Sequence, residues 1–294
     1  MITRTTSVMR QAQAARNMMA AAGQYAELQN QATTYRKLNR PSDDPSGTAN
    51  AVAIRASQAA SQQHTRNIQD GIGWLTTLDS SLMSVDSLLT RARDLTIQGA
   101  NDGSMSAAAK EAIASELEAI RDSLLKEANT QYQGRFVFAG TTDQSAAFEQ
   151  NYTFNGVPGS TVERRIADQK TVRVDADGQS VFGAGPASMF ALLDGIAADL
   201  RAGVNVKSRI GEIDTYAEQV RNAQATVGSR HSNVLTSQEA LATRTVELES
   251  QRSGIEDIDI TKVVGDLQMQ ELIYQTTLSV TARATQLNLM EYLR

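Results

Sequence analysis

The last third of the chain carries apolar residues at a regular spacing of seven. The repeated positions are Ile213, Val220, Val227, Val234, Leu241, Leu248 and Ile255. Such a repeat is typical of a helix whose apolar stripe packs along other helices. The companion positions are mostly polar, which favours a helix that touches several neighbours over a simple two-stranded coiled coil. A final amphipathic stretch has apolar residues at Leu267, Ile273, Val280 and Leu287.

The first half of the chain shows helical spacing in three further segments. A helix from Pro45 to about Gln98 is predicted by apolar residues that alternate steps of three and four: Leu75, Leu78, Leu82, Val85 and Leu89. A third helix follows, with its stripe at Ile113, Leu117, Ile120 and Leu124. Residues 1–40 carry a weaker stripe built from alanine, tyrosine and methionine, which predicts a helix with a poor apolar seam.

A proline-containing turn separates the first two predicted helices. It comprises Asn39, Arg40, Pro41, Ser42, Asp43, Asp44 and Pro45, and Gly47 follows. Proline disfavours helical dihedral angles in the residue before it, so the first helix is predicted to end at or near Arg40. Asp44 can cap the next helix, with Pro45 at the first helical position, where no backbone N–H is needed.

The pattern changes to short strands after residue 134. Runs bounded by turn residues predict strands at 135–140, 151–155, 161–166 and 170–174, and Asp177-Gly178 has the sequence of a hairpin turn. A short helix at 187–201 leads out of this insert. The chain therefore goes out along helices, makes a β excursion and returns along helices.

The predicted fold class is mainly α with a small β insert. The N- and C-terminal regions should form a long antiparallel helical coiled coil or bundle, with the β-rich domain at the distal end. Three domains are predicted: terminal helices at 1–40 plus 265–294, a helical bundle domain at 41–133 plus 203–264, and a β-rich insert with its exit helix at 134–202.

Composition narrows the classes of function. The 294 residues include 28 Lys+Arg and 33 Asp+Glu, a formal net charge of −5, which argues against a nucleic-acid-binding protein. With no cysteine, the chain has no disulfide and no catalytic thiol. No segment approaches roughly 18 uninterrupted apolar residues, so no membrane insertion is expected. Aromatic residues make up only 5%, which favours an elongated helical chain over a conventional globular core.

Candidate chemistry is sparse. The two histidines, His64 and His231, could form a metal pair or a pH switch, but packing at helix interfaces is the favoured interpretation. Glu256, Asp257 and Asp259 could form a carboxylate site, although a solvated face at a helix junction is favoured. No catalytic set, phosphate-binding loop or cofactor motif emerges, so neither an enzyme nor a cofactor is expected.

Four segments carry a family resemblance. They are 37–49, followed by Arg55 and Asn67, then 88–101, 129–140 and the ending 286–293. As a set they resemble the bacterial flagellin superfamily. Within it, 39–45 is more similar to the proteins that join hook to filament than to filament flagellins, which more often have Ser-Ala-x-Asp-Asp-Ala-Ala-Gly at this point.

The resemblance implies a secreted structural subunit of the extracellular flagellum, exported unfolded through the flagellar type III channel. It implies a ring of neighbouring copies at the hook–filament junction, between the protein FlgK and flagellin. It also implies an export chaperone of the FlgN type. Two alternatives stay open: a short filament flagellin and, more distantly, a coiled-coil metal protein or enzyme that uses His64 and His231.

The weak apolar content of the two ends suggests how such a subunit assembles. Ordering each backbone residue costs about 1–2 kcal/mol, whereas burying a large apolar side chain returns roughly 1.5–3 kcal/mol. An isolated pair of end helices with few large apolar residues is therefore marginal. We expect both ends, 1–40 and 265–294, to be frayed or disordered in the monomer and to become helical only between neighbouring subunits.

Overall fold

The computed structural model describes the backbone of residues 2–101, 105–157 and 159–292, and within these ranges the side chains from residue 9 to residue 283. It divides into two compact units. The first unit comprises Met1–Ala59 with Thr245–Arg294, and the second comprises Ala60–Arg244. Helices α2 (Pro45–Gly99) and α6 (Ile210–Glu256) contribute residues to both. The three-domain division predicted from the sequence stays a prediction.

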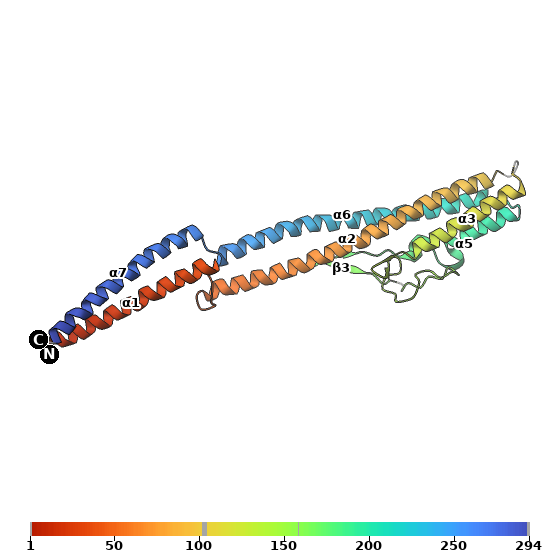
Figure 1. Ribbon diagram of the computed structural model, residues 1–294. Helices are drawn as coiled ribbons and strands as arrows, with labels where there is room; N and C mark the ends of the chain where they lie inside the picture. Colours follow the sequence, from red (N-terminus) through yellow and green to blue (C-terminus); the bar gives the residue numbers. More distant parts are fainter. Residues whose placement is uncertain (1, 102–104, 158, 293–294) are drawn as a thin grey trace. The chain divides into compact units, whose positions relative to one another are not determined.

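In the first unit, α1 (Ile2–Thr34) and α7 (Ile260–Tyr292) lie side by side, with the two chain termini at the same end of the pair (Figure 1). Ala21 on α1 and Gln270 on α7 are buried between them. The rings of Tyr25 and Tyr274 stack nearly parallel, with centroids 6.0 Å apart. The antiparallel pairing of the terminal helices is therefore confirmed.

The first helix ends earlier than predicted. It stops at Thr34 because Tyr35 adopts a left-handed conformation with φ of 57°, which a helix cannot continue through. Arg36 then forms an isolated antiparallel bridge with Asp257. The prediction of a helix end near Arg40 is wrong, because the chain leaves the helix to pair with the segment after α6 before it reaches the first proline.

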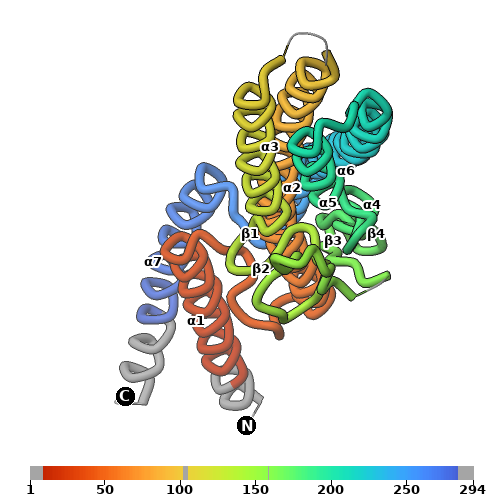
Figure 2. Tube along the Cα trace, turned by 90° about the vertical axis from the view of Figure 1, so that its right-hand side faces the viewer, coloured from red at the N-terminus to blue at the C-terminus, as the bar shows by residue number. Residues whose placement is uncertain are grey.

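The second unit gathers α2 and α6 with two shorter helices, α3 (Ala107–Ala128) and α5 (Met189–Arg201) (Figure 2). The predicted stripes of α2, α3 and α6 face its core, and α2 ends one residue beyond the predicted Gln98. Short 3₁₀ turns, η1 (Gly185–Ala187) and η2 (Lys207–Arg209), flank α5. Among the described residues, no helix is both long enough and apolar enough to cross a membrane.

The described residues of the β insert form two separate antiparallel hairpins. One pairs β1 (Gln131–Tyr132) with β2 (Arg135–Phe136), and the other pairs β3 (Glu163–Ala167) with β4 (Lys170–Arg173). The strand predicted at 151–155 is reduced to a single bridge between Phe148 and Phe154.

The hairpin predicted at Asp177-Gly178 is wrong. Asp177 instead caps a short helix, α4 (Gly178–Phe182), and its Oδ1 accepts a hydrogen bond of 3.1 Å from the backbone N–H of Gln179. Aspartate followed by glycine fits a helix start as well as a hairpin, because the carboxylate can satisfy a free backbone N–H.

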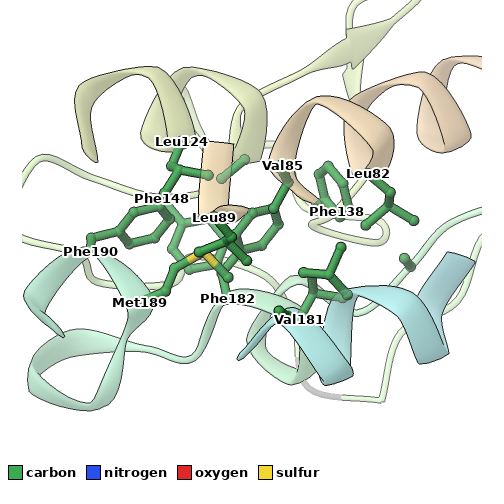
Figure 3. Close-up of a cluster of buried hydrophobic side chains, with 14 of the residues drawn as sticks. Leu82, Val85, Leu89, Leu124, Phe138, Phe148, Val181, Phe182, Met189 and Phe190 are labelled. Carbon is green, nitrogen blue, oxygen red and sulfur yellow. The ribbon is translucent and has the colours of Figure 1, made fainter. Parts of the chain in front are cut away.

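Phenylalanines of the insert form a cluster against the helices (Figure 3). Phe138 and Phe182 meet edge to face with centroids 4.9 Å apart, and Phe148 and Phe190 complete the group. Leu82, Val85, Leu89 and Leu124 lie in the same buried cluster. The helices and the insert of this unit therefore share one core, even though aromatic residues are few in the chain.

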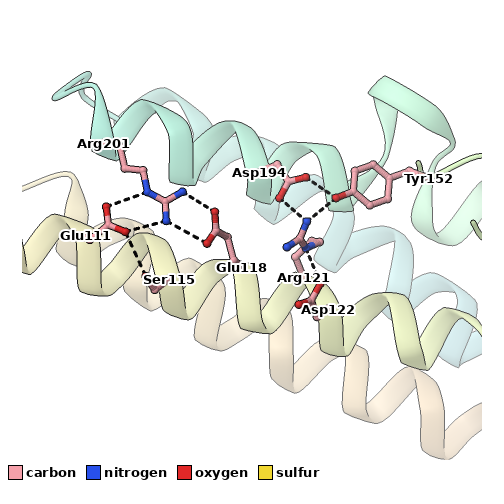
Figure 4. A network of polar contacts seen from close by, with 8 residues as sticks. All are labelled: Glu111, Ser115, Glu118, Arg121, Asp122, Tyr152, Asp194 and Arg201. Carbon is pink, nitrogen blue, oxygen red and sulfur yellow. Dashed lines mark hydrogen bonds and ion pairs between the residues drawn. The ribbon is translucent and has the colours of Figure 1, made fainter. Parts of the chain in front are cut away.

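Ion pairs fasten α3 to α5 at the edge of this core (Figure 4). Arg201 binds both Glu111 and Glu118, and these bonds lower the pKa of each carboxyl. Nearby, Arg121 contacts Asp194 at 3.0 Å and donates a 2.8 Å hydrogen bond to the Tyr152 hydroxyl, which itself bonds to Asp194. These contacts hold the turn of Tyr152 onto the two helices.

Candidate functional site

The predicted turn motif forms the start of α2 in the first unit. Asp44 Oδ1 accepts hydrogen bonds from the backbone N–H groups of Ser46, at 3.1 Å, and Gly47, at 2.9 Å, so the predicted cap is confirmed. The Gly47 bond and then the Ser46 hydroxyl lower the pKa of Asp44. A Cβ at Gly47 would lie 2.4 Å from Asp44 Oδ2 and 3.2 Å from Leu38, so a larger residue here would displace the capping carboxylate.

The rest of the motif is a tight exposed turn. The Arg40 N–H donates to Asp43 Oδ2 at 2.8 Å, and the Asp43 N–H donates back to the Arg40 carbonyl at 3.0 Å. Pro41 and Ser42 lie exposed at its tip, and Asn39 is exposed beside them. The turn is thus held by its own residues, and its outer side chains are free to meet another molecule.

A buried ion-pair cluster holds this turn against the end of α6. Glu256 is only 2% exposed; its Oε1 lies 2.7 Å from Arg55 Nη2, and its Oε2 lies 3.0 Å from Arg252 Nη1. Burial opposes ionisation of Glu256, but the two guanidinium groups outweigh it and lower its pKa. The prediction that Glu256 belongs to a solvated face is wrong, because two arginines neutralise it inside the junction.

Backbone contacts also join the segment before the turn to the end of α6. The Lys37 N–H donates a 2.7 Å hydrogen bond to the Glu256 carbonyl, next to the bridge between Arg36 and Asp257. A cavity of about 190 Å³ remains beside Arg36, Arg40 and Arg55. Asp259, the third predicted carboxylate, accepts the backbone N–H groups of Thr261 and Lys262 at the start of α7.

The terminal helix α7 has two different faces. The face toward α1 follows steps of four and three residues, and it is only partly apolar: Val263, Leu267, Gln270, Tyr274, Thr277 and Thr281. A second stripe points away from α1 and exposes Met269, Leu272, Ile273 and Val280, with Val280 59% exposed. Two of the four predicted assembly residues, Ile273 and Val280, thus lie outside the seam with α1. The side chain of Leu287 lies outside the described residues.

The predicted helix seams lie mostly in the core of the second unit. Fully or nearly fully buried are Leu75, Leu78, Leu82, Val85, Leu89, Ile213, Val220, Val227 and Val234, and Leu248 is buried in the first unit. Leu241 and Ile255 are half-buried. The stripe is therefore buried without interruption from Ile213 to Val234, and it alternates between half-buried and buried positions after that.

The remaining predicted residues belong to the second unit. The Asn67 side chain donates a 2.8 Å hydrogen bond to the carbonyl of Arg165, so it anchors the β3–β4 hairpin to α2 and takes no part in the turn. His64 Nε2 lies 3.2 Å from Asp168 in the same hairpin. His231 is half-buried on α6. The described part of the chain contains no group of three or more His, Asp or Glu side chains able to hold a metal ion.

Sequence reasoning missed the roles of Arg252, Glu256 and Gln270. The spacing of four residues between Arg252 and Glu256 favours an ion pair on one helix face, and it could have indicated their pairing. The contact of Glu256 with Arg55 joins residues far apart in the sequence, and no local pattern reports it. Gln270 gives no such signal, since a polar residue in a weak stripe looks like an exposed one.

Comparisons with known proteins agree on one family. A model of the bacterial flagellin N-terminal helical region matches residues 6–143, and one of the C-terminal helical region matches 210–293. The flagellar hook-associated protein 3 of Escherichia coli is 23% identical over 275 residues, covering 84% of this chain and 86% of that protein. A flagellin of Bacillus subtilis is also 23% identical, covering 88% and 89%. The crystal structure of Bacillus cereus FlgL is 25% identical, with a TM-score of 0.61, over 68% of this chain and 99% of that one.

The stability that the Glu256 ion pairs give to the first unit should be sensitive to acid. The folded-state pKa of Glu256 lies below the ordinary glutamate value of about 4.3, so its stabilising contribution is complete above that pH. The contribution is lost as pH falls through the folded-state pKa. Glu256→Gln should lower the free energy of unfolding of the first unit by about 1–3 kcal/mol at pH 7, measured by hydrogen exchange at the Lys37 amide. The difference from wild type should vanish in acid.

The matched control is Glu239→Gln, which changes an exposed carboxylate on the same helix and should leave the Lys37 amide unaffected. Equal effects of the two substitutions, or a Glu256→Gln effect that persists in strong acid, would contradict the ion-pair account.

Proposed function

Because the chain belongs to the bacterial flagellin family, we propose that it is a structural subunit of the flagellum that joins the hook to the filament. The hook-associated protein of Escherichia coli and FlgL of Bacillus cereus support this choice. The turn at 39–45 supports it further through its similarity to junction proteins. The proposed place of action is the extracellular hook–filament junction.

One observation carries the mechanism: α7 is paired with α1 yet leaves a second apolar stripe exposed. Met269, Leu272, Ile273 and Val280 form that stripe. The buried residues on the facing sides of the two helices are an alanine, a glutamine and a single valine, Val263, so the seam contributes little hydrophobic stabilisation. Packing the exposed stripe between neighbouring subunits would bury apolar surface and order both helices together.

The geometry of such packing limits growth at a junction. Contacts in which one surface of a subunit meets a different surface of the next are heterologous, and with a rise they build open helical tubes. Confined between two unlike partners, the same contacts stop at a ring. We propose copies of this chain as ring neighbours, with FlgK on one side and flagellin on the other.

Export supplies a further proposed partner. A subunit that crosses the type III channel unfolded must reach it without aggregating, and the exposed apolar stripe of α7 is a hazard in the cytosol. A chaperone of the FlgN type, bound to this C-terminal helix, would cover the stripe until export. The lack of cysteine suits a chain that crosses several redox environments.

A short filament flagellin is the second candidate function. The similarity to the Bacillus subtilis flagellin, of the same extent as that to the hook-associated protein, favours it. The two candidates differ in one property: a filament subunit polymerises without limit, whereas a junction subunit stops after a ring. The use of His64 and His231 by a metal protein or enzyme has no supporting cluster among the described side chains.

Labelling tests the proposed place of action. Gold-labelled antibody against this chain should mark a single band at the base of each filament in electron micrographs, because a junction ring is one layer. A band at the base supports the junction role. Label along the whole filament would contradict it and establish the filament flagellin instead.

Substitution tests the exposed stripe. Ile273→Ser with Val280→Ser should leave helix content and thermal unfolding unchanged, because both side chains are exposed in the monomer. The same pair should release filaments into the medium and abolish most swimming, because the assembly contact loses apolar area. The matched control is Glu271→Ser with Gln275→Ser, which replaces two exposed polar side chains of α7 outside the stripe. Normal swimming of the Ile273/Val280 variant would rule out the stripe as an assembly surface.

A further inference from the structure

A groove in the second unit lies between α6 and the segment that leads into α4. Its volume is about 310 Å³, within the range of small-ligand sites. One wall is a single face of α6, where Gln219, Asn222 and Thr226 carry amide and hydroxyl groups. Ala176, Val181 and Val227 give the groove an apolar base. It thus combines a small apolar surface with a polar rim.

Two arginines line the groove, and they differ in how they are neutralised. Arg173 forms two 3.0 Å bonds with the carboxylate of Asp175, which is fully buried. The Val162 N–H also donates to Asp175, at 2.8 Å, so this carboxylate is fully engaged. Arg230 reaches only the Asp175 carbonyl, at 2.8 Å, and no carboxylate of the described residues forms an ion pair with it.

The positive charge of Arg230 is therefore not balanced by an ion pair with any described carboxylate. It is half-buried, and burial together with the neighbouring charge of Arg173 lowers its pKa. A guanidinium has five N–H donors, and one of them is used by the carbonyl. The remaining donors form the planar fork that carboxylates bind with two parallel hydrogen bonds.

Nearby acids limit the charge of the ligand. Asp177 lines the same groove, and Asp175 lies behind the arginines. Both would repel a dianion such as phosphate more strongly than a singly charged carboxylate. The apolar base fits the short methylene stem of a glutamate side chain or of a small organic acid.

We propose that this groove is a binding site for a carboxylate group, with Arg230 as its anchor and Gln219 and Asn222 as polar contacts. The carboxylate comes either from an acidic side chain of an adjoining subunit or from a small organic acid. The binding test on the soluble chain does not depend on the proposed junction function.

The test is an NMR titration of the full chain with blocked glutamate (N-acetylglutamate N-methylamide). Shifts should concentrate at the Arg230 side chain and along 219–230, and blocked glutamine, the neutral isostere, should bind at least about tenfold more weakly. Inorganic phosphate should bind more weakly than blocked glutamate. Equal binding of the two blocked amino acids, or no saturable binding, would overturn the proposal.

Variants separate the anchor from general effects. Arg230→Gln should weaken binding of blocked glutamate about tenfold or more. Asn222→Asp offers a second route that leaves Arg230 in place, since Asn222 is exposed and an added negative charge there should repel the ligand. The matched control is Arg221→Gln on the same helix, where Arg221 pairs with Asp86 outside the groove. A loss with Arg221→Gln equal to that with Arg230→Gln would overturn the assignment.

Filament attachment in cells that carry the Asn222→Asp variant distinguishes the two sources of the carboxylate. If an adjoining subunit supplies it, Asn222→Asp should release filaments from their hooks. If a small organic acid supplies it, the same variant should lose binding in the titration while filaments stay attached. Either result supports the carboxylate site and names its occupant.

Discussion

The unequal apolar content of two helix seams is the physical constraint on which this structure depends. In the second unit, Leu75, Leu78 and Leu82 of α2 are fully buried, and each contributes roughly 1.5–3 kcal/mol relative to exposure. On the facing sides of α1 and α7 the buried residues are Ala21, Val263 and Gln270, supported by half-buried Leu267 and a tyrosine stack. The chain thus has one part with a sufficient core of its own and one part without it. We propose that a subunit built this way keeps a stable body while its ends depend on neighbouring subunits.

The buried carboxylate of Glu256 lies where α6 gives way to the terminal helices. Its carboxylate binds Arg55 of α2, and its backbone carbonyl accepts the N–H of Lys37 in the segment before the turn, so three segments of the first unit meet at one residue. Breaking a buried ion pair by removing one partner is costly, because the remaining charge is left uncompensated. An ion-pair cluster of this kind fixes the turn locally, even where α1 and α7 are held together by few buried apolar residues. The exposed tip at Pro41 and Ser42 is then presented in a defined conformation.

Periodicity predicted the long helices because their stripes repeat over many turns. Val220 and Val234 are buried because each additional repeat fixes the same face toward the core. The cap at Asp44 was predictable as well, since it depends on residues next to one another. Contacts between segments far apart in the sequence could not be predicted in this way. Tyr35 leaves the helix to bring Arg36 to Asp257, and Asp177 caps a helix where its sequence equally fits a hairpin. In α7 the apolar positions Ile273 and Val280 were visible, but their orientation away from α1 follows only from the pairing itself.

Hydrogen exchange on the soluble, unassembled chain tests the central claim most directly. The account predicts fast exchange of the amides in 9–34 and 260–283, where the seam is alanine, glutamine and tyrosine. It predicts slow exchange in 75–92 and 213–234, where large aliphatic side chains are fully buried. Protection in the two terminal helices equal to that in α2 and α6 would show that they hold their structure alone, and would contradict the account.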